Sequence, residues 1–143
     1  QKMSKSLGNV VAPKEWVERY GLYAVRVFLL REFPFGQDGS YSHEAVVGLK
    51  NADLANNLGN LAQRSLSMIF KNCDAAIPEP GEYTEADKAI LAQAEPLLEI
   101  SRADYELQDF HDALEKTWHV LGEVNAYLLT SSRGCYARRT SSA

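Results

Sequence analysis

The sequence predicts an all-helical domain, arranged as a bundle of about five helices. Three observations support this fold class. Apolar residues recur at spacings of three and four in several stretches, the pattern of helices with one buried face. Helix start and stop residues stand at the ends of these stretches. The length of 143 residues and the hydrophobic content of 45% are enough for one domain with a real core.

The longest periodic stretch begins at His43 and runs to Cys73. The residues expected on its buried face are Leu54, Leu58, Leu61, Met68, Ile69 and Asn72. Beside this stripe, Asn56, Asn60 and Arg64 follow one another at steps of four and form a polar edge. Spacing alone leaves open whether this edge contacts only water or a partner outside the domain.

Two shorter helices are expected before the central one, joined by a sharp turn. Pro13 is a favourable first residue for the first helix, which turns Trp16 inward, and Gly21 ends it. The second helix covers residues 22–32, and its expected apolar face contains Leu22, Val25, Phe28 and Leu29. A loop rich in proline, glycine and aromatic residues follows, and Ser42 is the expected N-cap of the central helix.

After the central helix, a linker with two prolines leads to further helices. Thr84 and Asp87 have the spacing of a capping box, and Pro96 is expected to break or kink the helical pattern that follows. The last clear helix is expected to begin at Asp109 or Phe110. Its apolar face is predicted to contain Phe110, Leu114, Trp118, Leu121 and Leu128.

Charge is distributed unevenly although the formal net charge is only −4. Residues 1–33 carry an excess of three cations, and residues 34–73 are balanced. Residues 74–123 contain thirteen acids and three bases, whereas residues 124–143 carry an excess of three arginines. An anionic partner is therefore expected to meet the neutral or basic segments, and the acidic block is expected to form a solvated outer face.

Several functional classes find no support in the composition. No run of about 18 apolar residues occurs, so no membrane span is expected, and no export leader is recognised. Cys73 and Cys135 lack metal-site spacing and are too few for a disulfide framework, which suits a reducing cytoplasm. His43, His111 and His119 are isolated, and we assign them no catalytic role. We expect no metal-ligand set in this sequence.

The segment from Lys2 to Ser6 reads KMSKS and is followed by Leu-Gly-Asn. Its ammonium groups, hydroxyls and glycine suit the phosphates of a nucleotide, although a solvated cationic terminus has the same composition. The string resembles the signature loop of class I aminoacyl-tRNA synthetases. The resemblance implies that ATP, with Mg²⁺, is the nucleotide and that Lys5 stabilises charge developing on the pyrophosphate. The binding residues it implies are Lys2, Met3, Ser4, Lys5 and Ser6.

A second pair of strings narrows the resemblance. GQDGSYSHE, at residues 36–44, and NADLANNLGNLAQR, at residues 51–64, resemble the methionyl-tRNA synthetase family. In that family the asparagine and arginine of the N-L-x-x-R element, which match Asn60 and Arg64, contact the anticodon CAU of tRNA(Met). Two alternatives stay open: the same region of another class I synthetase, such as a cysteinyl enzyme, and a non-catalytic helical RNA-binding or interaction module from a truncated gene.

The resemblance covers about Lys2 to Tyr127 and implies a division into three parts. Residues 1–33 correspond to the KMSKS loop and stem-contact segment, and residues 34–129 to the helical anticodon-binding domain. Residues 130–143 depart from the family and are expected to be an atypical, disordered tail. In the family, a Pro-Trp pair that supplies a further anticodon contact follows the Asn-Ala-Tyr element, and this tail lacks it.

The resemblance also implies what the sequence does not contain. The parent enzyme is expected to be a cytoplasmic methionine–tRNA ligase, in which a Rossmann catalytic domain with the HIGH motif binds methionine and ATP. That motif is missing from these 143 residues, which also do not begin with methionine. We therefore expect a piece of a longer protein, with the missing Rossmann domain as a partner. The isolated chain is expected to have no aminoacylation activity.

Overall fold

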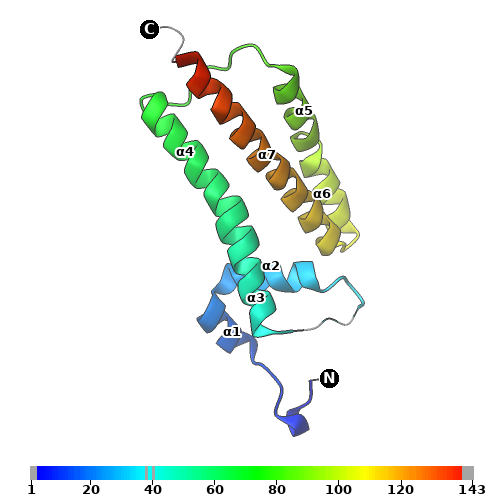
Figure 1. Cartoon of the computed structure of the whole chain (residues 1–143). Coiled ribbons are helices and arrows are strands. Elements are labelled where there is room, and N and C mark those ends of the chain that lie inside the picture. The colour runs from blue at the N-terminus through cyan, green and yellow to red at the C-terminus, as the bar shows by residue number, and fades with distance from the viewer. Residues whose placement is uncertain (1–2, 38, 40, 140–143) are drawn as a thin grey trace.

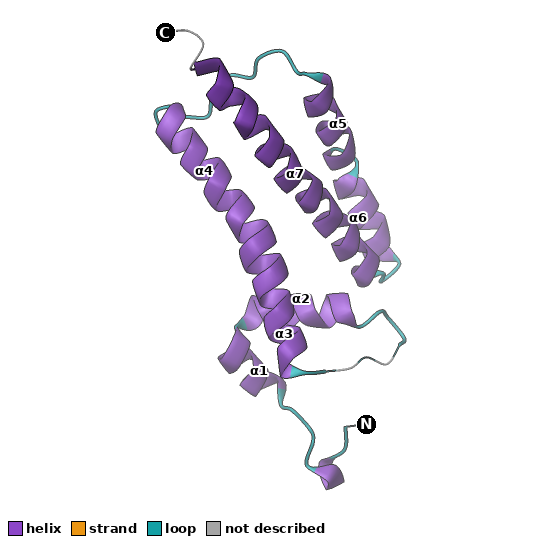
Figure 2. Ribbon diagram, in the orientation of Figure 1, coloured by secondary structure: helices purple, strands orange, loops and turns teal. Residues whose placement is uncertain are grey.

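The computed structural model describes residues 3–37, 39 and 41–139, with side chains for all of these except Lys5 and residues 131–139. Every regular element in this part of the chain is helical, which confirms the predicted fold class. The elements are η1 (Lys5–Leu7), α1 (Pro13–Tyr20), α2 (Leu22–Glu32), α3 (His43–Leu49), η2 (Lys50–Gly59), α4 (Asn60–Asn72), α5 (Glu85–Ala94), α6 (Leu97–Glu106) and α7 (Phe110–Arg139). They form an elongated molecule with a helical bundle at one end and a smaller helical layer at the other (Figures 1 and 2).

The smaller layer contains most of the fully buried side chains. Helices α1 and α2 pack against α3, and their shared core consists of Trp16, Tyr20, Ala24, Val25, Phe28, Val46 and Leu49. Phe28 is completely buried, and its ring meets the edge of Phe33 at a centroid distance of 5.7 Å. Tyr41 stacks on Trp16 at 4.1 Å. Phe33 and Tyr41, near the two ends of the loop between α2 and α3, therefore close the core locally, whereas Phe35 is 75% exposed.

Two apolar residues of α2 were expected in this core and lie outside it. Leu22 and Leu29 are 50% and 43% exposed, whereas Ala24 is buried. The reason is that α2 is apolar on several sides, so the sequence pattern did not define one face. Tertiary contacts with α1 and α3 select the side that carries Ala24, Val25 and Phe28.

The central helix runs from His43 to Asn72 without interruption but changes its hydrogen bonding on the way. Ser42 caps its start as predicted, its Oγ accepting from the backbone N–H of Ala45 at 3.0 Å. The turns of α3 give way to the π-helix η2 and then to α4. A π-helix bonds residue i to residue i+5, so the 3.6-residue period used in the prediction does not hold across residues 50–59.

The prediction of the buried stripe is correct for Leu54, Leu61 and Ile69 and wrong for three other residues. Leu58 and Met68 are 40% and 38% exposed, and Asn72 is exposed as well. Asn57 and Ser65, which were not predicted, are half-buried. From residue 53 to residue 72, the half-buried side chains are Asp53, Leu54, Asn57, Leu61, Ser65 and Ile69.

Helix α7 lies between α4 and the pair formed by α5 and α6 (Figure 1). The Thr84–Asp87 capping box is present at the start of α5, and Pro96 separates α5 from α6, both as predicted. Tyr127 Oη donates to Asp87, and Lys116 Nζ donates to Asp104 Oδ2 at 2.8 Å. These two contacts fix α7 to α5 and to α6.

The C-terminal part of α7 includes the beginning of the segment 130–143 that was expected to be a tail. The backbone is helical to Arg139. The side chains of residues 131–139 and all of residues 140–143 lie outside the described part of the chain. None of the described helices is both long enough and apolar enough to cross a bilayer.

Arg31 connects the two ends of the molecule. Its Nη1 pairs with Asp53 of η2, and its Nε donates to Glu115 Oε1 of α7 at 2.7 Å. Its carbonyl oxygen accepts from His111 Nδ1, and its guanidinium carbon lies 5.7 Å from the ring centroid of Trp118. The Arg31 side chain is only 18% exposed. One side chain of α2 therefore bonds to both η2 and α7.

Candidate nucleic-acid interface

The predicted polar edge is exposed on the outer side of the central helix. Asn60 is the first residue of α4, and Arg64 lies one turn further along. The Arg64 Nε donates to the Asn60 carbonyl oxygen at 3.2 Å. The structure thus brings these two predicted site residues together, with the asparagine side chain exposed beside the guanidinium group.

The guanidinium group of Arg64 also bonds to a neighbouring helix. Its Nη2 donates to Oδ1 of Asn125, on α7, at 2.6 Å. The Nδ2 group of Asn125 in turn donates to Asn57 Oδ1 at 2.6 Å and to the carbonyl oxygens of Asn57 and Leu121 at 3.1 and 3.2 Å. Three polar side chains therefore form a chain of hydrogen bonds across the α4–α7 contact.

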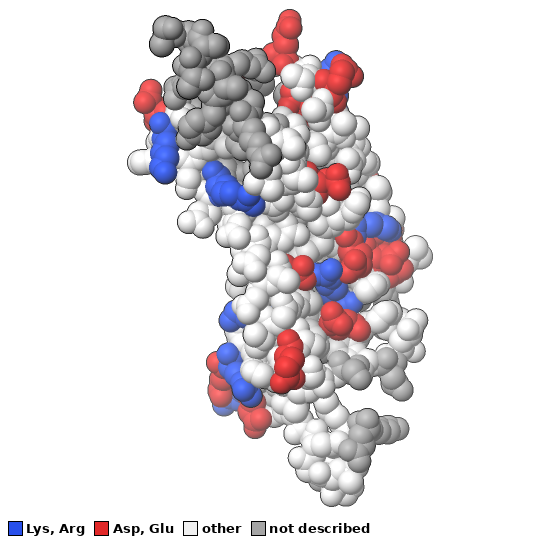
Figure 3. All heavy atoms as spheres, in the orientation of Figure 1, with Lys and Arg blue, Asp and Glu red and all other residues white. Residues whose placement is uncertain are grey.

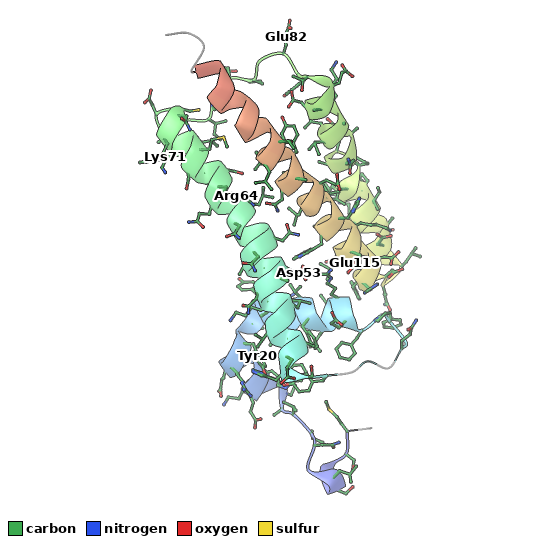
Figure 4. All side chains as sticks on the ribbon, viewed as in Figure 1. Tyr20, Asp53, Arg64, Lys71, Glu82 and Glu115 are labelled. Atoms are coloured by element: carbon green, nitrogen blue, oxygen red, sulfur yellow. The ribbon has the colours of Figure 1, made fainter. Side chains whose placement is uncertain are left out.

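The electrostatic surroundings of this edge favour an anion. Helix α4 contains two cations, Arg64 and Lys71, and no carboxylate. Figure 3 shows acidic atoms over α5 and α6, over the smaller layer and at the far end of α4, while the middle of α4 is free of them in this view. Figure 4 places Arg64 and Lys71 on the same helix, both at a distance from Asp53 and Glu115. The acid-rich segment expected from the sequence thus lies mainly on α5 and α6, and α4 itself contributes only cations.

The KMSKS segment forms a compact turn. The backbone N–H of Ser4 donates to Asn9 Oδ1 at 2.8 Å, and the two hydroxyl oxygens of Ser4 and Ser6 lie 2.5 Å apart. Gly8 has a φ of 63°, a value that glycine adopts without steric cost. Met3 is 45% exposed. Lys2 and the side chain of Lys5 lie outside the described residues.

The two predicted sites are at different places in the molecule. The KMSKS segment extends from the smaller layer near the N-terminus, whereas Asn60 and Arg64 lie on the helix that leads into the bundle (Figures 1 and 4). The structure does not bring them together.

The histidines that are bonded in this structure have structural partners. Tyr20 Oη lies 2.6 Å from His43 Nδ1, and Tyr41 Oη lies 3.4 Å from Tyr20 Oη. The hydrogen bond with Tyr20 raises the pKa of Tyr41 above its ordinary value. His111 is bonded to the Arg31 carbonyl oxygen. Among the described residues, no group of three histidine, cysteine, aspartate or glutamate side chains is placed to hold a metal ion.

Asn57 and Asn125 were not predicted from the sequence as members of the site. Asn125 stands at a position that continues the apolar stripe of α7, four residues after Leu121. Asn57 occupies a half-buried place in the stripe of the central helix. A polar amide in an apolar stripe needs a hydrogen-bond partner, so two such amides on different helices were a usable indication that they pair.

The sequence is similar to known proteins of one family. The family model for class I (M) tRNA synthetases matches residues 1–66. Over 127 residues, 89% of the chain, the sequence is 61% identical to the methionine–tRNA ligase of Brucella suis biovar 1 and 58% identical to that of Mycobacterium tuberculosis. The chain belongs with the methionyl-tRNA synthetases. It spans about a quarter of the length of these curated relatives, 25% and 24% respectively.

Solved methionyl-tRNA synthetases also share the fold. The crystal structure of the Mycobacterium tuberculosis enzyme bound by methionyl-adenylate matches with a TM-score of 0.89 and 54% identity. That match covers 99% of this chain and 28% of the other. The apo form of the same enzyme matches 84% of this chain, and 24% of its own length, with a TM-score of 0.82 and 55% identity. The helical arrangement described here is therefore that of one region of a methionyl-tRNA synthetase.

Proposed function

We propose that this chain is the part of a cytoplasmic methionine–tRNA ligase that contacts the CAU anticodon of tRNA(Met) and supplies the KMSKS loop. The observation that carries the proposal is the exposed Asn60–Arg64 edge on an acid-free helix, in a sequence 61% identical to a methionine–tRNA ligase. In the proposed parent enzyme, methionine reacts with ATP to release pyrophosphate, and the methionyl group then passes to the tRNA. The Rossmann domain that would perform the chemistry is outside this chain.

The residue types at the edge suit unstacked RNA bases. An amide offers both a donor and an acceptor to the Watson–Crick edge of a base, and a guanidinium group can donate to a base and stack on it. One turn of helix separates Asn60 from Arg64, so the two groups can meet neighbouring bases. The absence of a carboxylate from α4 lets the RNA backbone approach.

The KMSKS loop has a composition suited to the phosphates of ATP. The segment from Lys2 to Asn9 contains two lysines, two serines and a glycine, and no carboxylate. Lysine and hydroxyl groups donate to phosphate oxygens, and we propose that Lys5 stabilises the pyrophosphate as it leaves. Met3, Ser4 and Ser6 would lie along the same phosphates. Mg²⁺ prefers phosphate and carboxylate oxygens, so it is assigned to the nucleotide and not to this loop.

Replacement of Arg64 tests the anticodon contact. In the 143-residue chain, Arg64→Ala should weaken binding of a CAU anticodon stem-loop by about 1–3 kcal/mol and should reduce discrimination at one base. Binding is measured by fluorescence titration against stem-loops with single anticodon substitutions. Arg102→Ala, which removes an exposed cation of α6, is the matched control. Equal weakening for every anticodon would instead make Arg64 a phosphate contact, and unchanged binding would refute any RNA contact.

A separate measurement tests the catalytic half of the proposal. The isolated chain should give no ATP–pyrophosphate exchange in the presence of methionine, because it contains only one element of the catalytic machinery. Exchange by the isolated chain would contradict this. In the full-length enzyme, Lys5→Ala should lower the rate of methionine activation with little change in methionine binding. A normal activation rate would remove Lys5 from the reaction.

A further inference from the structure

We propose that Asn125 is a positioning residue, which fixes the guanidinium group of Arg64 in the orientation that it uses toward RNA. The role of this orientation in RNA binding rests on the proposed anticodon contact. Its geometric part, the ordering of Arg64 by Asn125, can be tested without RNA. The hydrogen bond from Arg64 Nη2 to Asn125 Oδ1 is 2.6 Å long and joins α4 to α7. Arginine side chains on a helix surface are otherwise mobile, and ordering one before binding lowers the entropic cost of contact.

The orientation of Asn125 is set by its other hydrogen bonds. Its amide nitrogen has three acceptors within 3.2 Å, two on Asn57 and one on Leu121. A flipped amide would place its oxygen against those three acceptors and its NH₂ group against Arg64, which can only donate. The oxygen of Asn125 is therefore held toward Arg64. Asn57 determines the orientation of Asn125, and Asn125 determines that of Arg64.

An amide has an advantage over a carboxylate at this place. A carboxylate would bind the guanidinium group more strongly, but its negative charge would offset the positive charge that attracts RNA. A neutral oxygen orients Arg64 and leaves that charge in place. The contacts to Asn60 and Asn125 use one N–H on Nε and one on Nη2. The other donors of the guanidinium fork remain available for a base or a phosphate.

The geometric part is tested by the mobility of the Arg64 side chain in the free 143-residue chain. We expect the ¹⁵N order parameter of the Arg64 Nε–H group to be that of an ordered group and to fall below about 0.6 in Asn125→Ala. The internal reference is Arg102, an exposed arginine that pairs with Glu99 of its own helix. If Arg64 is as mobile as Arg102 in the unsubstituted chain, or if Asn125→Ala leaves its order unchanged, the inference is overturned.

The functional part is tested by a double-mutant cycle with the CAU stem-loop. Asn125→Ala should lower affinity about five- to tenfold when Arg64 is present and should have no further effect in Arg64→Ala. An equal loss in both backgrounds would mean that Asn125 acts independently of Arg64, which would overturn the inference. If instead Arg64→Ala alone leaves affinity unchanged while the mobility result holds, the anticodon contact fails and the positioning of Arg64 stands.

Two further variants separate positioning from stability. Tyr127→Phe removes another hydrogen bond of α7, the one to Asp87, without touching Arg64. Tyr127→Phe should leave stem-loop affinity unchanged. If it lowers affinity as much as Asn125→Ala does, both effects come from destabilisation of α7, and the inference is overturned.

Asn125→Asp keeps the shape of the side chain but replaces the donor that faces Asn57 with an acceptor and adds a negative charge. We expect lower affinity for the stem-loop, and affinity equal to that of the unsubstituted chain would contradict the argument for a neutral oxygen.

Discussion

Arg31 of α2 and Glu115 of α7 are joined by a 2.7 Å hydrogen bond between Nε and Oε1. The same guanidinium group pairs with Asp53 of η2. This cation, whose side chain is 18% exposed, thereby contacts both η2 and α7. It adds a polar link between the smaller layer and the bundle, which the uninterrupted helix from His43 to Asn72 also joins.

Replacement of Arg31 should therefore destabilise the chain measurably. Arg31→Ala leaves Asp53, whose side chain is 20% exposed, without its cation, and a loss of about 1.5–3 kcal/mol in the free energy of unfolding is expected. Urea denaturation provides the measurement. Lys14→Ala is the matched control, because it breaks the exposed Lys14–Glu18 pair and should change stability by less than about 0.5 kcal/mol. Similar effects of the two variants would contradict a structural role for Arg31.

The core of the smaller layer should be sensitive to the loss of Phe28. This side chain is completely buried, so Phe28→Ala is expected to cost about 3–5 kcal/mol of unfolding free energy. Leu29→Ala is the neighbouring control, since Leu29 is 43% exposed. Thermal and urea unfolding should show a clearly larger loss of unfolding free energy for Phe28→Ala than for Leu29→Ala. A larger loss for Leu29→Ala would show that the core lies on the other side of α2.

Stability should decline in acid because of Asp87. The hydrogen bonds from Tyr127 and then from Thr84 lower the pKa of the Asp87 carboxyl. A carboxyl with a lower pKa in the folded state contributes stability above its unfolded pKa, about 3.9, and this contribution is lost as pH falls through the folded pKa. In Tyr127→Phe, the change in urea midpoint between pH 5 and pH 2 should be smaller than in the unsubstituted chain. An unchanged pH profile would assign the acid sensitivity to other carboxyls.

An opposite dependence is expected at alkaline pH from Lys116. The hydrogen bond to Asp104 raises the pKa of the Lys116 ammonium group. A raised pKa in the folded state gives stability that is fully present below the unfolded pKa, about 10.4, and is lost as pH rises through the folded pKa. The fall in urea midpoint between pH 9 and pH 11 should therefore be larger in the unsubstituted chain than in Lys116→Met. Equal differences would mean that tyrosine ionisation dominates the alkaline range.

Local determinants of the fold were predictable from the sequence. The cap at Ser42, the capping box of Thr84 and Asp87, and the break at Pro96 each depend on a few neighbouring residues, and the structure contains all three. The position of Asn60 and Arg64 on one exposed edge was also predictable, because residues four apart on a helix share a side.

Long-range determinants were not predictable in the same way. The hydrogen bond between Arg64 and Asn125 joins residues 61 positions apart, and the Arg31–Glu115 pair joins residues 84 apart. Helical periodicity describes one helix at a time and gives no information about which side chains meet across two. The error at Leu58 had a different origin, since the prediction assumed an α-helix where the structure has a π-helix.

The π-helix also sets the angular relation between Asp53 and Arg64. Asp53 points to Arg31, while Arg64, further along the same continuous helix, is directed toward Asn125. At Gly59, where η2 ends, a Cβ would lie 3.1 Å from the Leu54 carbonyl oxygen, five residues earlier. A tighter α-helical winding over residues 50–59 would turn α4 about its own axis relative to η2. The change from π-helix to α-helix at Gly59 therefore fixes the rotation of α4 about its own axis. That rotation determines which face of α4 is turned toward α7.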